Sequence, residues 1–473
     1  MTATTLVWFR QDLRVKDNPA LTWAVEQGNI IPIFILDTQN SQQYAPGGAS
    51  QWWLHHSLES LNRRLDGQLR IFAGDPQTII NELLAKHNFD HLAWNRCYES
   101  WQQERDRAIK QAVKQTSTLA KSFNGSLLWE PMSIAKGDGT PYKVFTPYYR
   151  NGCLKATSPR YPLASPSKIS YADYDLSASS IEELKLLPSI NWDTGFKELW
   201  SPGEDGAATQ LSDFIACAAI SYRDVRNIPS IKGTSHLSPH LHFGEISPNQ
   251  AWYAVLDAFG GSDNENIYTF LSELGWREFS YYLLFHWPSL PTDNFNSKFD
   301  RFHWDNNETL IKAWQKGQTG IPIIDAGMRE LWQTGYMHNR VRMVVGSFLV
   351  KNLRTDWRIG ERWFWDCLLD ADLASNSASW QWVAGSGADA APYFRIFNPI
   401  LQGEKFDKQG EYVKQYCPEL KALPNKYIHK PWDAPENVLQ SAGIRLGEDY
   451  PKPIVDLKVS RQQALDAYKE IKD

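Results

Sequence analysis

The sequence predicts a fold of two parts, an α/β doubly wound parallel-sheet domain followed by a larger all-α domain. Three observations support this prediction. Short apolar runs alternate with amphipathic stretches over residues 1–130, residues 131–200 are rich in Pro, Ser and Gly, and helical spacing dominates from residue 201 onward. Strands and helices in alternation are typical of a doubly wound sheet. We therefore expect an α/β domain (1–130), an interdomain linker (131–200) and an all-α domain (201–473).

Within the first domain, four apolar runs predict buried strands at Leu6–Phe9, Ile30–Leu36, Leu69–Phe72 and His91–Asn95. Helix-start signals lie between them, because Asp17 and Asp75 stand just before Pro19 and Pro76. Residues 49–65 carry apolar side chains at helical spacing, and a charged helix is expected from about residue 102. The domain contains no Gly-x-Gly-x-x-Gly sequence, so a conventional dinucleotide site is unsupported there.

The second domain carries helical spacing almost throughout. The expected helices are Ala207–Ser221, Ser247–Phe259, Ile267–Phe285, Glu308–Gln315, Ile323–Thr334, Tyr336–Leu353, Ile359–Leu369 and a surface helix, Ser460–Lys472. If residues 336–353 are helical, Asn339, Arg342 and Met343 share one face. Polar and soft apolar groups that converge in this way suit a ligand pocket.

Composition restricts the function classes. The net charge is −5, so any contact with DNA requires a local basic surface such as Arg340–Arg358, which a solvated helix face also explains. Five Cys without a Cys-x-x-Cys pair predict reduced thiols in a cytoplasmic protein, and no targeting or membrane-spanning segment is expected. His55-His56, His236, His240, His242 and His286 lack Cys or Asp at ligand spacing, so we expect no metal site.

Three ordered motifs carry a resemblance to a known family. They are Gly335-Tyr-Met-His-Asn-Arg-Val-Arg-Met343, Asp370-Ala-Asp-Leu-Ala-Ser-Asn376 and Trp380-Gln-Trp382. The chain resembles the photolyase/cryptochrome family from Trp8 to about Tyr450, and is most similar to class I-like photolyases that repair cyclobutane pyrimidine dimers. The resemblance implies an enzyme, a carbon–carbon lyase. Excited reduced FAD in it would pass one electron to a dimer flipped out of DNA.

The resemblance also implies which residues bind FAD in its active, reduced anionic form. They are Tyr222, Thr234, Ser235, His236, Leu237, Ser238, Phe270, Arg342, Phe364, Asp370, Asp372 and Asn376. Arg342 and Asp370 would pair beside the flavin ring, and Asn376 would face its N5 atom. From the residues alone, the Thr234–Ser238 loop is also explained as a helix cap, and Asp372 and Asn376 are also explained as capping residues. His236 stands where relatives often have Arg.

A second set of residues would contact the damaged DNA. The resemblance assigns catalytic roles to Glu273, Asn339, Met343 and Asn376, and DNA contacts to Arg226, Trp276, Arg277, Asn339, Arg340 and Trp382. A carboxyl beside an indole favours its protonated form, so Glu273 could donate to a base carbonyl. Taken alone, Glu273 and Arg277 are equally an ion pair on a solvated face, and Met343 is plain core.

Two further sets follow from the resemblance. Trp304, Trp357 and Trp380 match a chain that carries electrons from the surface to the flavin, although any of the 21 Trp is a core residue by default. Arg10, Asp37 and Glu104 match an antenna cleft for a second chromophore, a folate or a deazaflavin. Arg10 and Asp37 are also explained as exposed polar residues at strand ends.

Alternatives within and beyond the family remain. A (6-4) photolyase typically has a His pair where this chain has Asn339 and Met343, which favours cyclobutane dimers. A cryptochrome, a blue-light receptor without repair, commonly alters the positions of Glu273 or Asn376. A DASH-type protein acting on single-stranded DNA keeps many of the same residues. Gly275 stands where many relatives have a bulkier residue. We expect a monomer that binds DNA containing pyrimidine dimers and no membrane.

Overall fold

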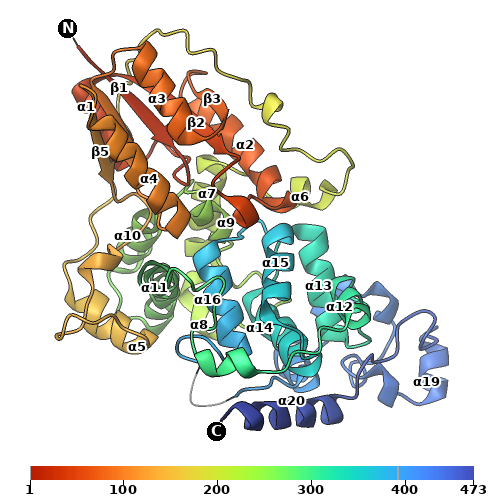
Figure 1. The fold of residues 1–473 in the computed structure, drawn as a ribbon. Helices are drawn as coiled ribbons and strands as arrows, with labels where there is room; N and C mark the ends of the chain where they lie inside the picture. The colour runs from red at the N-terminus through yellow and green to blue at the C-terminus, as the bar shows by residue number, and fades with distance from the viewer. Residues whose placement is uncertain (1, 391–393, 473) are drawn as a thin grey trace. The chain divides into compact units, whose positions relative to one another are not determined.

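The computed structural model describes residues 2–390 and 394–472, which form two compact units that interleave along the sequence (Figure 1). The first, here called the sheet unit, comprises Met1–Ile220, Ser235–Pro288 and Asp372–Ala374. The second, the helical unit, comprises Ser221–Thr234, Ser289–Ala371 and Ser375–Asp473. The predicted domains instead meet at residues 130 and 200, and that division stays a prediction.

Five parallel strands in the order β3-β2-β1-β4-β5 form the centre of the sheet unit. They are β1 (Ala3–Phe9), β2 (Gly28–Asp37), β3 (Arg70–Gly74), β4 (His91–Asn95) and β5 (Leu119–Phe123). The predicted α/β fold class is confirmed, with four of the strands close to their expected positions. The sequence analysis missed β5, an edge strand whose exposed and half-buried residues lack the apolar run of a central strand.

Helices cover both faces of this sheet. On one face, α3 (Pro76–Lys86) and α4 (Ser100–Val113) pack against each other and the strands (Figure 1). Their Ile80 and Ile109 side chains join Trp8 and Ile33 in a buried cluster. Val7 and Phe9 are buried too, and a strand directs them to the opposite face. There α1 (Pro19–Gln27) contacts β1, β2, β4 and β5.

The remaining helices of the sheet unit are α2 (Gly48–Arg64), α5 (Phe145–Pro147), α6 (Thr194–Leu199), α7 (Glu204–Cys217), α9 (Ser238–His242), α10 (Pro248–Phe259) and α11 (Glu265–His286). Among them, α2, α7, α10 and α11 lie close to predicted spans, whereas the short helices α5, α6 and α9 were not predicted. The longest is α11, and a capping box at Ser247 and Gln250 starts α10.

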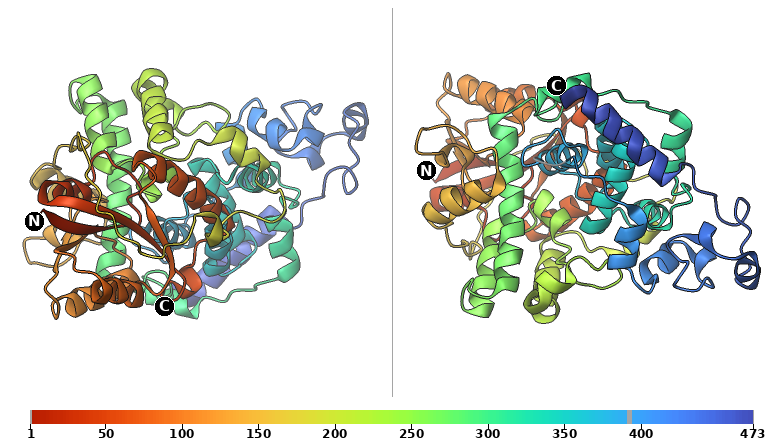
Figure 2. Two further views of the ribbon diagram at one scale, coloured as in Figure 1. Left: turned by 90° about the horizontal axis from the view of Figure 1, so that it is seen from above. Right: turned by 90° about the horizontal axis from the view of Figure 1, so that it is seen from below.

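Residues 126–149 lie along α11, as both views in Figure 2 show. The Glu278 carboxylate accepts the N–H groups of Leu128 and Trp129 at 2.8 and 3.2 Å. The Tyr282 hydroxyl accepts the N–H of Tyr142 and donates to the carbonyl of Ile134, both at 3.0 Å. The bonds to Ile134 and Tyr142 thus fasten the start of the predicted surface linker (131–200) to one helix.

The helical unit packs around α13 (Pro322–Thr334), α14 (Asn339–Ser347) and α15 (Trp357–Cys367). The helix expected over 336–353 begins later, because the His338 ring accepts the N–H of Arg340 at 3.2 Å and caps α14. A π-helical turn, Phe348–Asn352, follows it. The other helices are α8 (Tyr222–Val225), α12 (Glu308–Gln315), α16 (Leu373–Ala384), α17 (Pro399–Phe406), α18 (Glu411–Tyr416), α19 (Glu436–Ser441) and α20 (Leu457–Lys472).

All five cysteines are free thiols, and four of them (Cys97, Cys153, Cys367 and Cys417) are buried. Burial raises the pKa of Cys97 to about 11 and that of Cys153 to about 12. Cys217, at the end of α7, is exposed. Among the described residues, no helix combines the length and apolarity needed to cross a membrane.

Asp325 anchors the start of α13, and its removal should destabilise the helical unit. Its carboxylate accepts the N–H groups of Thr319 (2.7 Å) and Gly320 (3.0 Å) and the hydroxyls of Thr319 and Tyr450 (both 2.7 Å) in a fully buried site. Asp325→Ala should lower the free energy of unfolding, measured with urea, by about 2–4 kcal/mol, because buried donors lose their acceptor. Asp325→Asn keeps the shape and one acceptor oxygen, so it should lose less; an equal loss would contradict this account.

Candidate functional site

The residues assigned to function fall in both units, and each set is described within its own unit. The sheet unit holds Arg10, Asp37, Glu104, Ser235, His236, Leu237, Ser238, Phe270, Glu273, Trp276, Arg277 and Asp372. The helical unit holds Tyr222, Arg226, Thr234, Trp304, Asn339, Arg340, Arg342, Met343, Trp357, Phe364, Asp370, Asn376, Trp380 and Trp382.

Trp276 on α11 is partly exposed, and an aromatic ring covers one face of its indole. Phe145 stacks on it with the ring centroids 3.8 Å apart and the planes 12° from parallel. Tyr149 stacks in turn on Phe145 at 5.4 Å and 10°. Glu273 lies one turn before Trp276 on the same helix, as expected, and is also partly exposed.

Gly275 explains why these rings can approach α11. A Cβ atom at this position would lie 2.6 Å from two ring carbons of Tyr149, closer than carbon atoms can pack. A glycine inside a helix costs about 1 kcal/mol relative to alanine. The close approach of the Tyr149 ring gives a physical reason for the glycine that the sequence analysis noted as a departure.

Arg277 is placed differently from Glu273 and Trp276. Its guanidinium donates to the carbonyl of Ser126 at 2.9 Å and to the Glu278 carboxylate at 3.1 Å, and lies 4.8 Å from the centre of the Tyr281 ring. Only 14% of its side chain is exposed. This surrounding favours an anchoring role for Arg277, and the predicted DNA contact gains no support from it.

Asp372 is held by neighbouring donors in the sheet unit. The Tyr281 hydroxyl donates to it, and His242 Nδ1 lies 3.9 Å from its Oδ2 atom. Burial raises the pKa of this carboxyl, but the hydrogen bonds and charges of His242, Arg277 and Tyr281 outweigh burial and lower the pKa to about 2. Asp372 is therefore an ionised acceptor in a fixed orientation.

The loop that leads into α9 contains the backbone strain expected of a binding segment. His236 has a φ of 51°, in the left-handed region that non-glycine residues rarely adopt. Its ring lies 5.8 Å from that of Trp200. Phe270 is buried against Phe214, with ring centroids 4.6 Å apart, so it belongs to the core around this segment.

Arg10 and Asp37 belong to one buried network at the sheet. Arg10 pairs with Asp106 at 2.7 Å, and Arg105 pairs with both Asp106 and Asp37 at 3.0 Å. The guanidinium groups of Arg10 and Arg105 lie 4.5 and 4.9 Å from the Trp8 ring. The alternative of exposed polar residues at strand ends is therefore wrong. The sequence analysis missed Arg105 and Asp106 and named their exposed neighbour Glu104, which lies outside the network.

In the helical unit, Arg342 and Asp370 form the expected pair. Arg342 Nη2 donates to Asp370 Oδ2 at 2.9 Å, and Nε donates to the carbonyl of Met337 at 2.7 Å. Asp370 Oδ1 is buried and has no hydrogen-bond partner among the described residues. A buried acceptor without a donor is costly, so this atom suits a ligand that donates to it.

Asn376 is oriented by the neighbouring helix. Its Nδ2 donates to the carbonyl of Glu361 at 3.1 Å, which leaves its side-chain oxygen available as an acceptor. The partner is a carbonyl of α15 and not an N–H of its own helix, so the alternative of a helix cap is wrong for Asn376. Ser377 donates to the Glu361 carboxyl, whose pKa burial raises to about 7.

Asn339 and Met343 lie one turn apart on α14, the first exposed and the second half-buried. Arg340, between them, donates twice to Asn227 Oδ1, at 2.8 and 3.2 Å. Burial and the nearby charges of Arg226 and Arg395 lower the pKa of Arg340. Positive charges gathered around Arg340 suit phosphate groups, and Arg395 was not among the predicted DNA contacts.

The three Trp of the predicted chain differ in burial. Trp357 and Trp380 are 0% and 3% exposed, whereas Trp304 is partly buried beside Phe302, 4.4 Å away. Trp380 packs edge-on against Phe364 at 4.9 Å, and Trp357 Nε1 donates to Asn294 at 3.0 Å. Trp304 is thus the most exposed of the three, and the electron-transfer chain itself stays a prediction. Trp382, two residues beyond Trp380, is half-buried.

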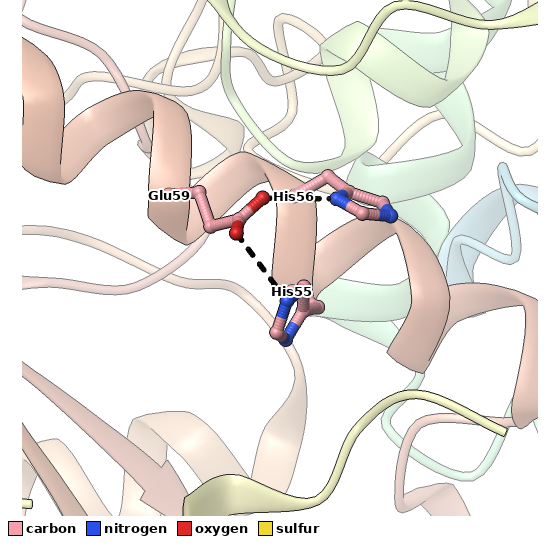
Figure 3. Close-up of side chains that lie close together, drawn as sticks. All are labelled: His55, His56 and Glu59. Carbon is pink, nitrogen blue, oxygen red and sulfur yellow. Dashed lines mark hydrogen bonds and ion pairs between the residues drawn. The ribbon is translucent and has the colours of Figure 1, made fainter. Parts of the chain in front are cut away.

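Two histidines on α2 lie close to a carboxylate (Figure 3). His56 Nδ1 and His55 Nε2 lie 3.0 and 3.6 Å from different oxygens of Glu59. The sequence analysis considered Cys or Asp partners and so missed Glu59. A metal-binding imidazole usually hydrogen-bonds through its second nitrogen, but those of His55 and His56 are buried without a partner within the described chain. The cluster is better explained by the hydrogen bond of His56 and the close contact of His55 with Glu59, and the absence of a metal site stays a prediction.

Comparisons with known proteins cover nearly the whole chain. A family model described as DNA photolyase matches residues 5–167, and one described as FAD binding domain of DNA photolyase matches residues 270–470. A deoxyribodipyrimidine photo-lyase from Agrobacterium fabrum (strain C58 / ATCC 33970) is 47% identical over 476 residues, 100% of this chain and 98% of that protein. Cryptochrome-2 of Arabidopsis thaliana is 38% identical over 488 residues, 98% of this chain and 78% of that protein.

A solved structure is similar over the same length. The crystal structure of a bacterial class III photolyase from Agrobacterium tumefaciens gives a TM-score of 0.94 at 46% sequence identity. It covers 100% of this chain and 98% of that one. The fold and the extent of the resemblance noted in the sequence are therefore confirmed.

The stability of the protein should depend on pH through Glu278. Burial raises the pKa of this carboxyl from 4.5 to about 7, and Arg277 and the N–H groups of Trp129 and Leu128 oppose burial only in part. Between these values the folded state keeps a proton that the unfolded chain releases, so the free energy of unfolding falls as pH rises from about 4.5 to about 7. In Glu278→Gln this fall should become shallower, measured by urea unfolding across the range.

The part of the slope that remains in the variant should come from other buried acids such as Glu99 and Glu330, whose pKa values burial also raises to about 7. An unchanged slope in Glu278→Gln would mean that Glu278 is ionised in the folded protein. The amide of the variant still offers an oxygen to Leu128 and Trp129, so the fold should persist.

Proposed function

We propose, because the chain belongs to the DNA photolyase/cryptochrome family and is an enzyme of its photolyase branch, that it repairs cyclobutane pyrimidine dimers in DNA when illuminated. The observation that carries this proposal is the pair Glu273 and Trp276 on α11, in a chain that matches a deoxyribodipyrimidine photo-lyase over its whole length. Trp276 offers one face of an indole to a base, and Glu273 offers a carboxyl one turn away.

The residues present fit FAD. In the helical unit, the buried Asp370 Oδ1 has no donor among the residues that the structure describes, the Arg342 guanidinium supplies a positive charge beside it, and Asn376 presents a carbonyl oxygen. In the sheet unit, Asp372 presents an ionised carboxylate that Tyr281 holds in place. Bound FAD in its reduced form would supply, on absorbing light, the electron that opens the cyclobutane ring.

Each side chain then has a task that its surroundings support. Arg342 would favour an anionic ring beside it, while Asn376 and Asp372 would accept hydrogen bonds from the ring edge. Tyr222 and the segment Thr234–Ser238 would contact the cofactor's phosphates, with Phe270 and Phe364 as apolar walls. Asn339, Met343, Trp382 and Trp276 would contact the dimer.

Arg226, Arg340 and Arg395 would hold the DNA backbone. Arg226 and Arg395 both act on the charge of Arg340 in the helical unit, so the three residues would supply the local basic surface that a chain of net charge −5 requires. Binding that rests on phosphate contacts weakens as salt rises, because fewer counterions are released. We place the enzyme in the cytoplasm as a monomer acting on damaged DNA.

A second chromophore would bind near the network of Arg10 and Asp37. The guanidinium and carboxylate groups of this network would supply charge beside a pigment, whereas Trp8 is buried beneath them. A folate and a deazaflavin are both candidates for this pigment. The subgroup follows the class III photolyase to which the chain is similar, in place of the class I-like subgroup that the motifs suggested.

The alternative is a cryptochrome-type receptor without repair, and the 38% identity to a plant cryptochrome is the observation that favours it. A (6-4) photolyase is disfavoured by Asn339 and Met343. These hypotheses are distinguished by an absorption spectrum and by a light-dependent repair assay on dimer-containing DNA, both single- and double-stranded. Colourless protein after reconstitution with FAD, or dimers that persist under light, would overturn the proposal. Repair restricted to single strands would point to the DASH type.

Glu273→Ala should retain FAD but lower the repair yield per absorbed photon by about 5- to 10-fold, the worth of one hydrogen bond to a group that gains charge. Yield is measured on enzyme reduced beforehand, under single-wavelength light. Glu273→Gln keeps a donor at the same place and should recover part of the yield. If the alanine variant repairs as well as the unmodified enzyme, Glu273 has no part in the reaction.

Trp380→Phe should block light-driven reduction of oxidised flavin, because phenylalanine is much harder to oxidise, and leave repair by chemically reduced enzyme intact. Flavin absorbance during illumination follows the first property. Trp314→Phe is a matched control, since Trp314 is fully buried with its ring 6.3 Å from that of Trp380 but lies outside the predicted chain. Loss of repair after chemical reduction would contradict the assigned role.

A further inference from the structure

Three aromatic rings stack in a column against α11 of the sheet unit. Tyr149 rests on the bare backbone of Gly275, Phe145 stacks on Tyr149, and Trp276 stacks on Phe145. The planes differ by 10° and 12° from one ring to the next. Tyr149 and Phe145 are 2% and 7% exposed, so the column leads from the core to one partly exposed indole.

We infer that this column fixes the indole of Trp276 for lesion recognition, which makes Phe145 and Tyr149 positioning residues and Gly275 the position that admits them. The inference rests on the proposed function in one respect, that Trp276 is the residue on which the flipped-out dimer stacks. Because Phe145 covers one face of the indole, a base can stack only on the other. Rotation of the indole would separate two rings that lie 3.8 Å apart.

The column is held at its base by the hydrogen bonds of residues 126–149. Glu278 and Tyr282, on the same helix as Trp276, bind the backbone of Leu128, Trp129, Ile134 and Tyr142. Phe145 follows directly in α5, and Tyr149 lies in a π-helical turn, Tyr148–Gly152 (Figure 1). Such turns are uncommon and frequently occur at functional sites. The segment thus holds the rings of Phe145 and Tyr149 at fixed positions against α11.

The first experiment measures the ratio of affinities for dimer-containing and undamaged DNA. In Phe145→Leu and in Gly275→Ala this ratio should fall by about 3- to 10-fold, the worth of one aromatic stack. Tyr148→Leu is the matched control, because Tyr148 is a buried ring of the same segment that contacts Phe279 and Tyr282 but not the column. Among the described ring contacts, Tyr148 reaches Phe145 and Trp276 only through the edge contacts of Phe279, so the variant should lower thermal stability and change the ratio much less than Phe145→Leu.

A double-mutant cycle separates positioning from general packing. If Phe145 acts through Trp276, then Phe145→Leu should have no further effect on the ratio in a Trp276→Ala background. An equal effect in both backgrounds overturns the inference, as does an unchanged ratio in the single variants. Gly275→Ala also tests the column through stability. The clash with Tyr149 should lower the melting temperature, whereas alanine without a clash would stabilise the helix, so a raised melting temperature would overturn the column's geometry.

A third measurement does not depend on repair. Protein labelled with 5-fluorotryptophan gives a fluorine resonance for Trp276, assigned by its loss in Trp276→Phe. Phe145→Leu should shift this resonance, because the ring current of a face-stacked phenyl group is removed, and Tyr148→Leu should shift it much less. If the unmodified protein fails to bind dimers, the proposed function falls while this shift still decides whether the column exists. An unshifted resonance would overturn the column.

Discussion

Buried carboxylates that must find hydrogen-bond donors organise both units. Ionised or neutral, a carboxyl group that loses water needs partners, and the free energy at stake for each group is comparable to the net stability of a domain. Glu278 in the sheet unit takes its donors from Leu128, Trp129 and Arg277. Asp325 in the helical unit takes its own from Thr319, Gly320 and Tyr450. In each case an acid on a helix determines where an irregular segment lies.

The candidate site also contains a buried carboxylate, but one of its oxygens has no described hydrogen-bond donor. Glu330 is satisfied by the hydroxyl of Tyr412 at 2.5 Å and the N–H of His338 at 3.1 Å, whereas Asp370 has one satisfied oxygen and one buried oxygen without a described donor. A buried acceptor without a donor is uncommon in a native fold. The proposed cofactor would explain this exception by completing the hydrogen bonds of Asp370.

The sequence predicts the fold class and most strands, since apolar runs and helical spacing are local properties. It also predicts the Arg342–Asp370 pair, but through resemblance to a family, because 28 residues separate the partners. Spacing alone could not have found the pairing of Asp37 with Arg105, because it depends on the end of β2 lying close to α4 in the folded chain. The edge strand β5 was missed because one side of it faces solvent and its apolar content is low.

Helix α11 contains residues whose placement the sequence predicts and, next to them, residues whose contacts it does not predict. Glu273 and Trp276 share a face because helical periodicity places them there, and the sequence predicted as much. Arg277 turns to Ser126 and Glu278, and Phe145 covers Trp276, because a segment more than a hundred residues away packs on the same helix. No pattern within α11 encodes that contact. Gly275 was the one local sign of it, a residue whose absent side chain marks where another ring must fit.

The distribution of the thiols has a practical consequence. Four cysteines lie in the interior and resist deprotonation, while Cys217 alone among the five stands at the surface, where α7 ends. A maleimide dye or spin label added to the native protein would therefore attach at a single defined point. The molecule already carries the attachment site that distance measurements by fluorescence or electron resonance usually require engineers to introduce.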